Sequence, residues 1–356
     1  MFACSSSIAS GPVRPAPPVK PEGRGKPKGL FVLEEKTFEL TYGGAVSRRV
    51  GHLADIIDGP QTRESIAGRP DLLGQVEVIF SGWGAPIMDK SFLDAAPNLE
   101  AVFYGAGSVG YFVSEEFWKR DILLTGAADL NAQPVAEYTL SVILLCLKNF
   151  WGLSAAVRHG EGWGDHTRYV TGAFRSKVAL VSCGMVARRT LALLKAFDLE
   201  CLVYDPFLSN AEARKLGVRL CSLDEAFSEG DVVSLHAPDK PETEGMITGR
   251  HFSLMKPGAA FINTARPRIV RQDELLAVLG ARPDLRMILD VCDPEPLPPD
   301  SPLLGFPNVI ITPHIAGSLG PECARLGEFI LAEFQRYLAG EPLVGEITRT
   351  RAAIMA

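Results

Sequence analysis

Four side chains that can bind an anion or move a proton stand shortly after apolar segments of the chain. Arg266 ends the segment FINTAR, Asp290 and Asp293 lie in MILDVCDPEP, and His314 lies in VIITPHIAG. A guanidinium group can hold a carboxylate, and an imidazole can give or take a proton near neutral pH. Oxidising a secondary alcohol needs a base for the hydroxyl proton, a cation for the substrate's oxygens and a hydride acceptor. These residues are candidates for the base and the cation.

Arg266, His314 and Asp293 also have a structural interpretation. Arg266 could cap a following helix, and His314 could bond a backbone carbonyl. Asp293 precedes Pro294, and an aspartate in that position is typical of a turn. The residue types alone leave both interpretations open.

A candidate site for the hydride acceptor lies in the segment VALVSCGMVARRTLALLKAFDLECLVYD. An apolar strand at Val178–Val181 precedes a tight turn, an amphipathic helix and a second strand at Cys201–Tyr204. This order is that of a dinucleotide-binding βαβ unit, whose turn usually has the pattern G-x-G-x-x-G. The three glycine positions of that pattern hold Ser182, Gly184 and Ala187 here.

The turn retains only its middle glycine, and Ser182 places a Cβ atom where the backbone has to bend sharply. The helix would still offer the N–H groups of Met185 and Val186 to a pyrophosphate. Asp205 follows the second strand, where a carboxylate accepts hydrogen bonds from ribose hydroxyls and repels a 2′-phosphate. The next two residues supply no cation. NAD is therefore predicted in preference to NADP.

The elements that position these residues alternate between strand and helix patterns. The first series has strand candidates at Leu30–Leu33, Val76–Phe80 and Leu99–Phe103, with helices expected over Val46–Ile57 and Lys90–Ala96. The second series has strand candidates at Val178–Val181, Cys201–Tyr204, Val232–Leu235, Ala259–Asn263, Arg286–Leu289 and Val309–Ile311. This alternation predicts an α/β fold with two doubly wound parallel-sheet domains.

The order of the two series predicts that one domain is inserted in the other. A helix over Val135–Trp151 would join the series, and a helix after His314 has apolar residues at helical spacing. We expect this last helix to pack on the first domain. The predicted domains are a flavodoxin-like substrate domain at 28–132 plus 316–348 and a Rossmann NAD-binding domain at 133–315. Residues 1–27, rich in Pro, Gly and basic residues, are expected to be a disordered tail rather than a targeting peptide.

Composition narrows the class of protein. The 356 residues are 47% hydrophobic and 22% charged, with a formal net charge of -6, which disfavours nucleic acid as a partner. The 7 cysteines are scattered without CxxC pairs or nearby histidine clusters, so we expect reduced thiols in a cytoplasmic protein and no metal site. No continuously apolar stretch is long enough to predict a membrane span.

Five motifs resemble, in order, those of the D-isomer-specific 2-hydroxyacid dehydrogenase family, which includes phosphoglycerate dehydrogenases and hydroxypyruvate reductases. They are KVALVSCGMVARR, DVVSLHAPDKPETEGMI, MKPGAAFINTAR, LDVCDPEPLPPDSPL and NVIITPHIAGS. The resemblance implies that Arg266 binds the substrate's carboxylate and carbonyl, that His314 is the general acid/base, and that Asp293 is its acidic partner. It further implies a homodimer acting on a small 2-hydroxy or 2-keto acid.

The same resemblance assigns residues to cofactor and substrate. Asp290 would contact the nicotinamide carboxamide, and the cofactor would be lined by His236, Ala237, Thr243, Thr264 and Ala265. The loop Gly105–Ser108, with Gly105, Ala106, Gly107 and Ser108, would bind the substrate carboxylate through backbone N–H groups. Asn131 would lie beside the nicotinamide, and Trp83 could shape the substrate site or be structural.

Three positions depart from the family's pattern. Asp293 stands where the family usually has glutamate, Pro267 follows the arginine where glycine is usual, and Ser182 replaces the first glycine. Proline removes an N–H group and favours an extended Arg266. The alternative function is an NAD(H)-responsive binding or regulatory protein with little turnover. The sequence does not identify the side chain of the 2-hydroxy acid.

Overall fold

Two separate parallel sheets organise the chain in the computed structural model, which describes residues 25–161, 163 and 165–355. The first unit runs up to Ala128 and resumes at Cys323–Ala353, and the second spans Asp129–Glu322 and the chain from Ile354. Most of the predicted tail, up to residue 24, lies outside the described residues. The domain boundaries expected at 132/133 and 315/316 lie instead at 128/129 and 322/323, because the helix residues from Asp129 and the segment up to Glu322 both belong to the second unit.

The first unit contains a five-stranded parallel sheet in the order β2-β1-β3-β4-β5, as in flavodoxin-like folds. Its strands are β1 Lys28–Val32, β2 Asp55–Ile56, β3 Val78–Ser81, β4 Ala101–Tyr104 and β5 Leu123–Gly126. Its helices are α1 Glu35–Thr41, α2 Ala45–Leu53, α3 Arg63–Ala67, α4 Pro70–Leu73, α5 Lys90–Ala95, α6 Glu115–Lys119, α14 Glu322–Ala339 and α15 Arg349–Ile354. The helix expected over Val46–Ile57 was too long, because Asp55–Ile56 pairs with β1 as the edge strand.

Helix α14 packs on the first sheet, as predicted from its apolar spacing. The ring of Phe334 lies 4.9 Å from that of Phe80 and 5.1 Å from that of Phe103. Burying one such side chain contributes about 1.5–3 kcal/mol. The buried Glu333 carboxylate of α14 also accepts a 2.9 Å hydrogen bond from the Thr125 hydroxyl of β5. The first unit is therefore built from two separate stretches of the sequence that share one hydrophobic core.

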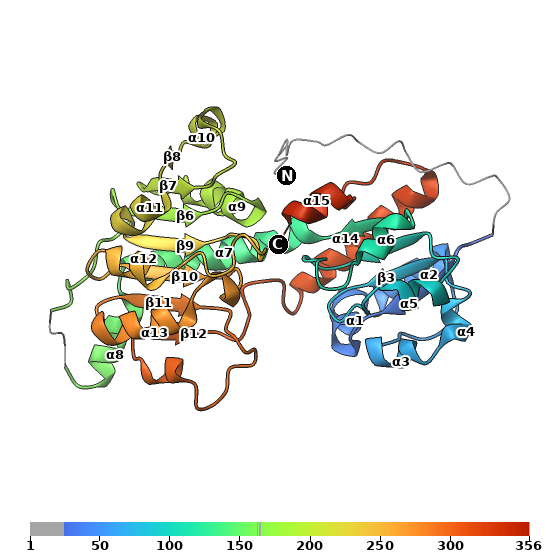
Figure 1. The fold of residues 1–356 in the computed structure, drawn as a ribbon, viewed down its shortest axis with the longest axis horizontal. Coiled ribbons are helices and arrows are strands. Elements are labelled where there is room, and N and C mark those ends of the chain that lie inside the picture. Colours follow the sequence, from blue (N-terminus) through green and yellow to red (C-terminus); the bar gives the residue numbers. More distant parts are fainter. Residues whose placement is uncertain (1–24, 162, 164, 356) are drawn as a thin grey trace. The chain divides into compact units, whose positions relative to one another are not determined.

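The second unit contains a seven-stranded parallel sheet in the order β12-β11-β10-β9-β6-β7-β8 (Figure 1). Counted from β6, this is the Rossmann strand order with one additional edge strand. The strands are β6 Lys177–Val181, β7 Glu200–Tyr204, β8 Arg219–Leu220, β9 Val232–Leu235, β10 Ala260–Asn263, β11 Arg286–Leu289 and β12 Val309–Ile311. The two doubly wound domains predicted from the sequence are thus confirmed.

Helices cover this second sheet and connect its strands. They are α7 Ala128–Leu147, α8 Phe150–Arg158, α9 Met185–Leu194, α10 Asn210–Leu216, α11 Leu223–Glu229, α12 Gly249–Leu254 and α13 Gln272–Ala281, with 3₁₀ turns η1 Pro267–Ile269 and η2 Pro302–Gly305. The single helix predicted over Val135–Trp151 is wrong at both ends. Helix α7 begins before Pro134, and it ends ahead of Asn149, whose φ of 48° starts a new helix.

Helix α7 is also longer and more apolar than expected from its sequence pattern. Among the described helices it alone is long and apolar enough to cross a membrane, and 44% of its most apolar window is buried. Val142, Ile143 and Cys146 of this helix belong to the core beneath the second sheet. This packing is that of a core helix.

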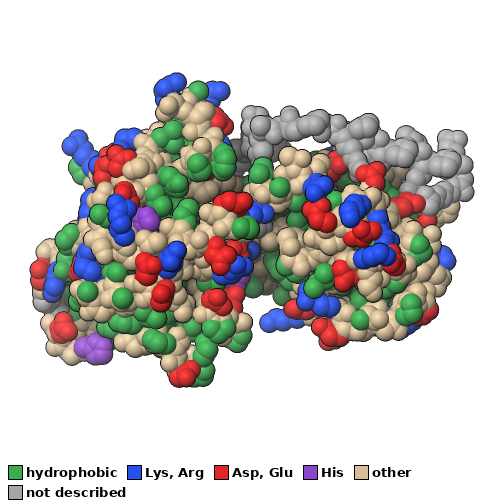
Figure 2. All heavy atoms as spheres, viewed as in Figure 1, with side chains coloured by type: hydrophobic (Ala, Val, Ile, Leu, Met, Phe, Trp, Pro, Cys, Tyr) green, Lys and Arg blue, Asp and Glu red, His purple; other side chains and the backbone are tan. Residues whose placement is uncertain are grey.

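On the face drawn in Figure 2, acidic and basic side chains are interspersed.

Candidate active site

The carboxyl ends of six neighbouring strands form one edge of the second sheet. Strand register aligns Tyr204 with Val181 and Val181 with Leu235. It also aligns Leu235 with Asn263, Asn263 with Leu289, and Leu289 with Ile311. The residues that follow these ends are Asp205, Ser182, His236, Thr264, Asp290 and Thr312. With strands about 4.8 Å apart, the sheet places five predicted cofactor residues along one edge, where α/β proteins bind ligands.

The turn after β6 requires a left-handed residue. Ser182 has a φ of 78°, and its N–H donates to the Tyr204 carbonyl at 2.7 Å. This conformation costs a non-glycine residue about 1–2 kcal/mol, so the predicted strain is present and the serine tolerates it. Gly184 is the N-cap of α9, and a Cβ atom there would contact nothing within 4 Å. The open space beside Gly184 suits the close approach of a phosphate.

Asp205 holds this turn from the end of β7. Its carboxylate accepts hydrogen bonds from the N–H groups of Cys183 at 2.7 Å, Phe207 at 2.8 Å and Leu208 at 3.0 Å. The Ser182 hydroxyl is 3.4 Å away. The carboxylate is partly exposed and retains acceptor capacity on Oδ2, which has one short hydrogen bond.

The start of α9 offers free donors. Its first intrahelical hydrogen bond runs from the Arg188 N–H to the Gly184 carbonyl at 3.0 Å, so the N–H groups of Met185 and Val186 precede the helical ladder. Burial raises the pKa of the neighbouring Cys183 thiol to about 11, which keeps it neutral. An anion at this helix terminus would meet backbone donors and no thiolate.

The segment after β9 contains His236, Ala237 and Thr243. Burial lowers the pKa of His236 to about 4, and its Nε2 lies 2.9 Å from the Ser234 hydroxyl. The imidazole is therefore neutral above that pH. Ala237 is buried, and the Thr243 hydroxyl donates to the Pro238 carbonyl at 2.5 Å. Thr243 thus fixes the loop, and its hydroxyl is already engaged there.

The segment after β10 carries an unmatched polar atom. Oγ1 of Thr264 is buried without a hydrogen-bond partner in the described chain, a costly state unless a ligand completes it. The Ala265 N–H is held by the Asn263 side chain at 2.9 Å. A dinucleotide bound along this edge would meet three matching features. They are the unpaired Thr264 hydroxyl, the open space at Gly184 and the backbone N–H donors at the start of α9.

Arg266 has the extended backbone that Pro267 was predicted to impose, with φ −143° and ψ 145°. Proline then opens the short turn η1. The guanidinium donates from Nη1 to the Ala265 carbonyl at 2.7 Å and is partly buried. Its remaining N–H groups leave it able to bind a carboxylate.

Asp290 supports the segment that carries the histidine. The carboxylate is 1% exposed and accepts from the Thr312 hydroxyl at 2.6 Å, from the Ile315 N–H at 2.8 Å and from the Ala316 N–H at 2.9 Å. The backbone carbonyl of Asp290 accepts from the His314 N–H at 3.0 Å. Asp290 was predicted to contact the nicotinamide, and in the structure most of its acceptor capacity serves this segment.

The partner of His314 is Glu295 and not Asp293. Nδ1 of His314 lies 2.9 Å from Oε1 of Glu295. Asp293 is exposed. The hydrogen bond with Glu244 raises the pKa of Arg268, and the charge of Asp293 makes only the smallest contribution to that shift. Pro294 and Pro296 flank Glu295 in this loop. The carboxylate of Glu295, on a longer side chain than that of Asp293, is the one that reaches the imidazole ring. A carboxylate only accepts, so Nδ1 carries the proton and Nε2 is available for substrate.

Sequence reasoning also missed contacts from α7. The Tyr138 hydroxyl lies 2.9 Å from the Thr312 hydroxyl, and Oδ1 of Asn131 accepts from the Ser318 N–H at 3.0 Å. Asn131, predicted to lie beside the nicotinamide, therefore anchors the segment after His314. These contacts join positions far apart in the sequence, and no local pattern signals them.

The predicted carboxylate-binding loop belongs to the first unit and follows β4. Gly105 is buried, and a Cβ atom there would come 2.8 Å from Oη of Tyr42, so glycine is required for space. Ala106 is buried, whereas Gly107 and Ser108 are partly exposed. Within the described chain their two N–H groups donate to no protein acceptor, so they can receive an anion.

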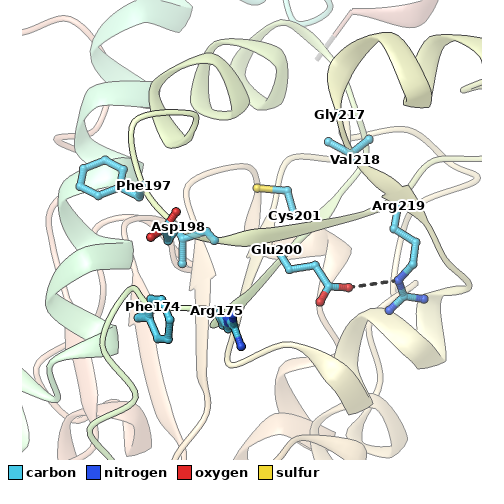
Figure 3. A pocket seen from close by; sticks show the side chains of 10 residues that line it. Phe174, Arg175, Phe197, Asp198, Glu200, Cys201, Gly217, Val218 and Arg219 are labelled. Atoms are coloured by element: carbon cyan, nitrogen blue, oxygen red, sulfur yellow. Dashed lines mark hydrogen bonds and ion pairs between the residues drawn. The ribbon is translucent and has the colours of Figure 1, made fainter.

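A separate surface cavity of about 770 Å³ lies elsewhere on the second unit. Figure 3 shows the residues that line it, among them Phe174, Phe197 and Cys201. Arg219 also lines the cavity and donates a hydrogen bond to the Glu200 carboxylate. Glu200 begins β7, whereas Asp205 follows the other end of that strand. The cavity is therefore at the amino ends of the strands, away from the predicted site. The described residues contain no cluster of three potential metal ligands.

Comparison with known proteins agrees with this architecture. Residues 140–316 match the NAD binding domain of the D-isomer specific 2-hydroxyacid dehydrogenases. A glyoxylate reductase of Thermofilum pendens is 30% identical over 260 residues, 71% of this chain and 76% of its own length. A phosphoglycerate oxidoreductase from Rhizobium etli has the same fold, with a TM-score of 0.75 at 23% identity over 91% of this chain and 99% of that chain.

The chain belongs to the D-isomer specific 2-hydroxyacid dehydrogenase family. A D-3-phosphoglycerate dehydrogenase of Archaeoglobus fulgidus is 29% identical over 72% of this chain and 48% of its own length. The chain spans about half the length of the phosphoglycerate dehydrogenases that it matches. The second unit is the family's NAD-binding domain.

Proposed function

We propose that this protein is an NAD-dependent dehydrogenase of small 2-hydroxy acids, which also reduces the corresponding 2-keto acids. The observation that carries the proposal is the His314–Glu295 pair at 2.9 Å, placed at the sheet edge that also holds the dinucleotide features. The named relatives, a glyoxylate reductase and phosphoglycerate dehydrogenases, support the reaction class.

In this proposal each side chain has a defined task. Arg266 binds the substrate carboxylate and carbonyl through its remaining N–H groups. In the first unit, Gly107 and Ser108 offer backbone donors to an anion. Nε2 of His314 accepts the hydroxyl proton during oxidation and returns it to the carbonyl oxygen during reduction. Glu295 holds Nδ1–H and so fixes the ring. NAD, when bound, supplies the hydride acceptor.

We further propose NAD rather than NADP as the cofactor. Asp205 presents a carboxylate that a 2′-phosphate would approach at an energetic cost. Its spare Oδ2 capacity suits a ribose hydroxyl. Thr264, with its orphan Oγ1, and the neutral His236 would line the same edge.

A cytoplasmic homodimer is also proposed, from the family and from helix α7. Part of that helix is buried in the core of its own unit, and Leu144 and Leu145 stay partly exposed. Light scattering at micromolar concentration should give twice the chain mass of 38.5 kDa. A single-chain mass would contradict the dimer.

The test of function uses His314→Ala with NADH and glyoxylate. We expect the variant to bind NADH normally by fluorescence and to lose about 100–10,000-fold in kcat, the contribution of general acid/base catalysis. NADH binding without oxidation by the unaltered protein on glyoxylate, hydroxypyruvate, pyruvate and phenylpyruvate would instead favour the binding-protein alternative.

A further inference from the structure

Helix α7 contacts the segment that carries His314 at two points. The Tyr138 hydroxyl lies 2.9 Å from the Thr312 hydroxyl, and Oδ1 of Asn131 accepts from the Ser318 N–H at 3.0 Å. Asn131 and Tyr138 are separated by about two helical turns, so they lie on the same face of the helix. One contact precedes His314 in the sequence and the other follows it. The same helix face therefore holds both ends of the segment.

The hydrogen bond at Tyr138 has a defined direction. The Thr312 hydroxyl donates its single proton to Oδ1 of Asp290 at 2.6 Å, so the Tyr138 hydroxyl has to be the donor to Thr312. Burial raises the pKa of Tyr138, and the phenol therefore keeps the proton that this contact needs. We call Tyr138, Thr312 and Asp290, with the two hydrogen bonds between them, the Tyr138 network.

The Tyr138 network ends on the carboxylate that fixes the backbone at His314. Asp290 is 1% exposed and accepts from the N–H groups of Ile315 at 2.8 Å and Ala316 at 2.9 Å. Its backbone carbonyl accepts from the His314 N–H at 3.0 Å. The φ of His314 is 53°, a left-handed conformation that persists only where surrounding contacts determine it. Tyr138 thus orients one of the three groups that donate to this carboxylate.

The ring and the hydroxyl of Tyr138 have different tasks. The ring packs against the core cluster that contains Ile143 and Cys146, whereas the hydroxyl reaches the Thr312 side chain. A phenylalanine at this position would keep the packing and remove the hydrogen bond. The Thr312 hydroxyl would then lose the donor that orients it, and the network would lose the mutual strengthening of linked hydrogen bonds. One substitution therefore separates the two tasks.

We propose that Tyr138 is a positioning residue, which acts through Thr312 and Asp290 to hold the backbone that presents the His314 imidazole to the substrate. This inference rests on the proposed function, in which His314 moves the proton. All four residues belong to the second unit, so the Tyr138 network is complete within one domain. A residue with this role affects the proton-transfer step and leaves cofactor binding unchanged.

The experiment measures kcat and KM for glyoxylate reduction by NADH in Tyr138→Phe and in Ser141→Ala, which removes an exposed hydroxyl from the same helix. We expect kcat to fall about 3–10-fold in Tyr138→Phe, the range of one net hydrogen bond, with the KM for NADH unchanged. The solvent deuterium isotope effect on kcat should rise, because proton transfer becomes slower. Ser141→Ala should keep the rate of the unaltered protein.

Two changes at Thr312 test whether Tyr138 acts through this residue. Thr312→Val removes the shared hydroxyl and should lower kcat about 10–100-fold, the effect of leaving buried partners unpaired. Thr312→Ser keeps the hydroxyl and should retain about half of the rate or more. When Tyr138→Phe is added to Thr312→Val, kcat should fall by less than about twofold further, because both residues belong to one network.

Hydrogen–deuterium exchange gives a readout that does not need turnover. The backbone amides of residues 312–318 should exchange faster in Tyr138→Phe than in the unaltered protein, because the segment opens more often when one of its contacts is lost. Ser141→Ala should leave the exchange of these amides unchanged. Circular dichroism of each variant checks that it is folded.

The outcomes separate the two proposals. Turnover of glyoxylate by the unaltered protein with an equal kcat in Tyr138→Phe, or with losses that multiply in the double variant, overturns the positioning role and leaves the proposed function standing. A lower kcat accompanied by an equal rise in the KM for NADH shows a general structural effect and also overturns that role. No turnover of any keto acid by the unaltered protein overturns the proposed function. Unchanged exchange of the 312–318 amides in Tyr138→Phe then overturns the inference as well.

Discussion

Two aspartates follow strand ends at the same sheet edge and hold their turns in the same manner. Asp205 accepts three backbone N–H groups beside Ser182, whose φ is 78°. Asp290 accepts two backbone N–H groups and the Thr312 hydroxyl beside His314, whose φ is 53°. Asp290 is 1% exposed, whereas Asp205 is partly exposed. Exposure therefore decides whether such a carboxylate can also serve a ligand.

The comparison explains how left-handed, non-glycine residues persist at both turns. Such conformations cost about 1–3 kcal/mol each and survive where surrounding contacts determine them. Charge-assisted hydrogen bonds to each aspartate, worth roughly 1.5–3 kcal/mol apiece, are sufficient. At His314 the strained backbone presents the imidazole to Glu295. At Ser182 it bends the chain before the start of α9.

The largest effect is expected from Asp290→Asn, which breaks the buried turn. The amide would place an NH₂ group against backbone donors, leaving at least one of them unsatisfied. We expect kcat to fall about 100-fold or more, since 1 Å of misplacement has that effect. The free energy of unfolding should fall by about 1–3 kcal/mol in urea denaturation. The control is Asp300→Asn, at an exposed aspartate of the same unit; an equal loss of activity there would contradict the specific role of Asp290.

A smaller effect is expected from Asp205→Ala at the exposed turn. The variant loses both the turn contacts and the acceptor for the ribose, so NADH affinity should fall about 10-fold or more. NADPH affinity should fall less, because a repulsive charge is removed. Fluorescence titration with both cofactors measures this change. An unaltered ratio of the two affinities would show that Asp205 does not discriminate between them.

The smallest effect is expected from Ser182→Gly. Glycine relieves the left-handed strain of about 1–2 kcal/mol but increases the entropy of the unfolded chain, which offsets about 0.5–1 kcal/mol. The Tm of the second unit should rise by about 1–4 °C. NADH affinity should stay within about twofold, since the serine already adopts the conformation that glycine would take. Much tighter NADH binding would show that the Cβ atom crowds the phosphate.

Much of the fold could be predicted because buried parallel strands are short continuous apolar runs. Val232–Leu235 and Arg286–Leu289 have the bounds expected from the sequence. The edge strands Asp55–Ile56 and Arg219–Leu220 were missed, because a strand of two residues is too short to show an alternating or continuously apolar pattern. Helix α7 was misjudged because Pro134 normally marks a helix start, and here the helix continues through it.

Candidate site residues that directly follow a strand could be located from the sequence. Contacts that depend on the course of a loop could not. Apolar runs precede Arg266, Asp290 and His314, so the position of these residues at the carboxyl edge of the second sheet could be inferred. The choice of Glu295 over Asp293 depends on the path of a proline-rich loop, which no periodicity describes. The support from Tyr138 comes from a helix distant in sequence.

The most direct test of the central claim compares Glu295→Gln with Asp293→Asn. Both changes remove one carboxylate from the same loop and keep nearly the same size. If Glu295 holds the His314 ring for proton transfer, Glu295→Gln should lower kcat for glyoxylate reduction about 10–100-fold and change its pH profile. Asp293→Asn should retain the rate within about twofold, as expected of an exposed substitution. The reverse result, with Asp293→Asn impaired and Glu295→Gln active, would contradict the assigned dyad.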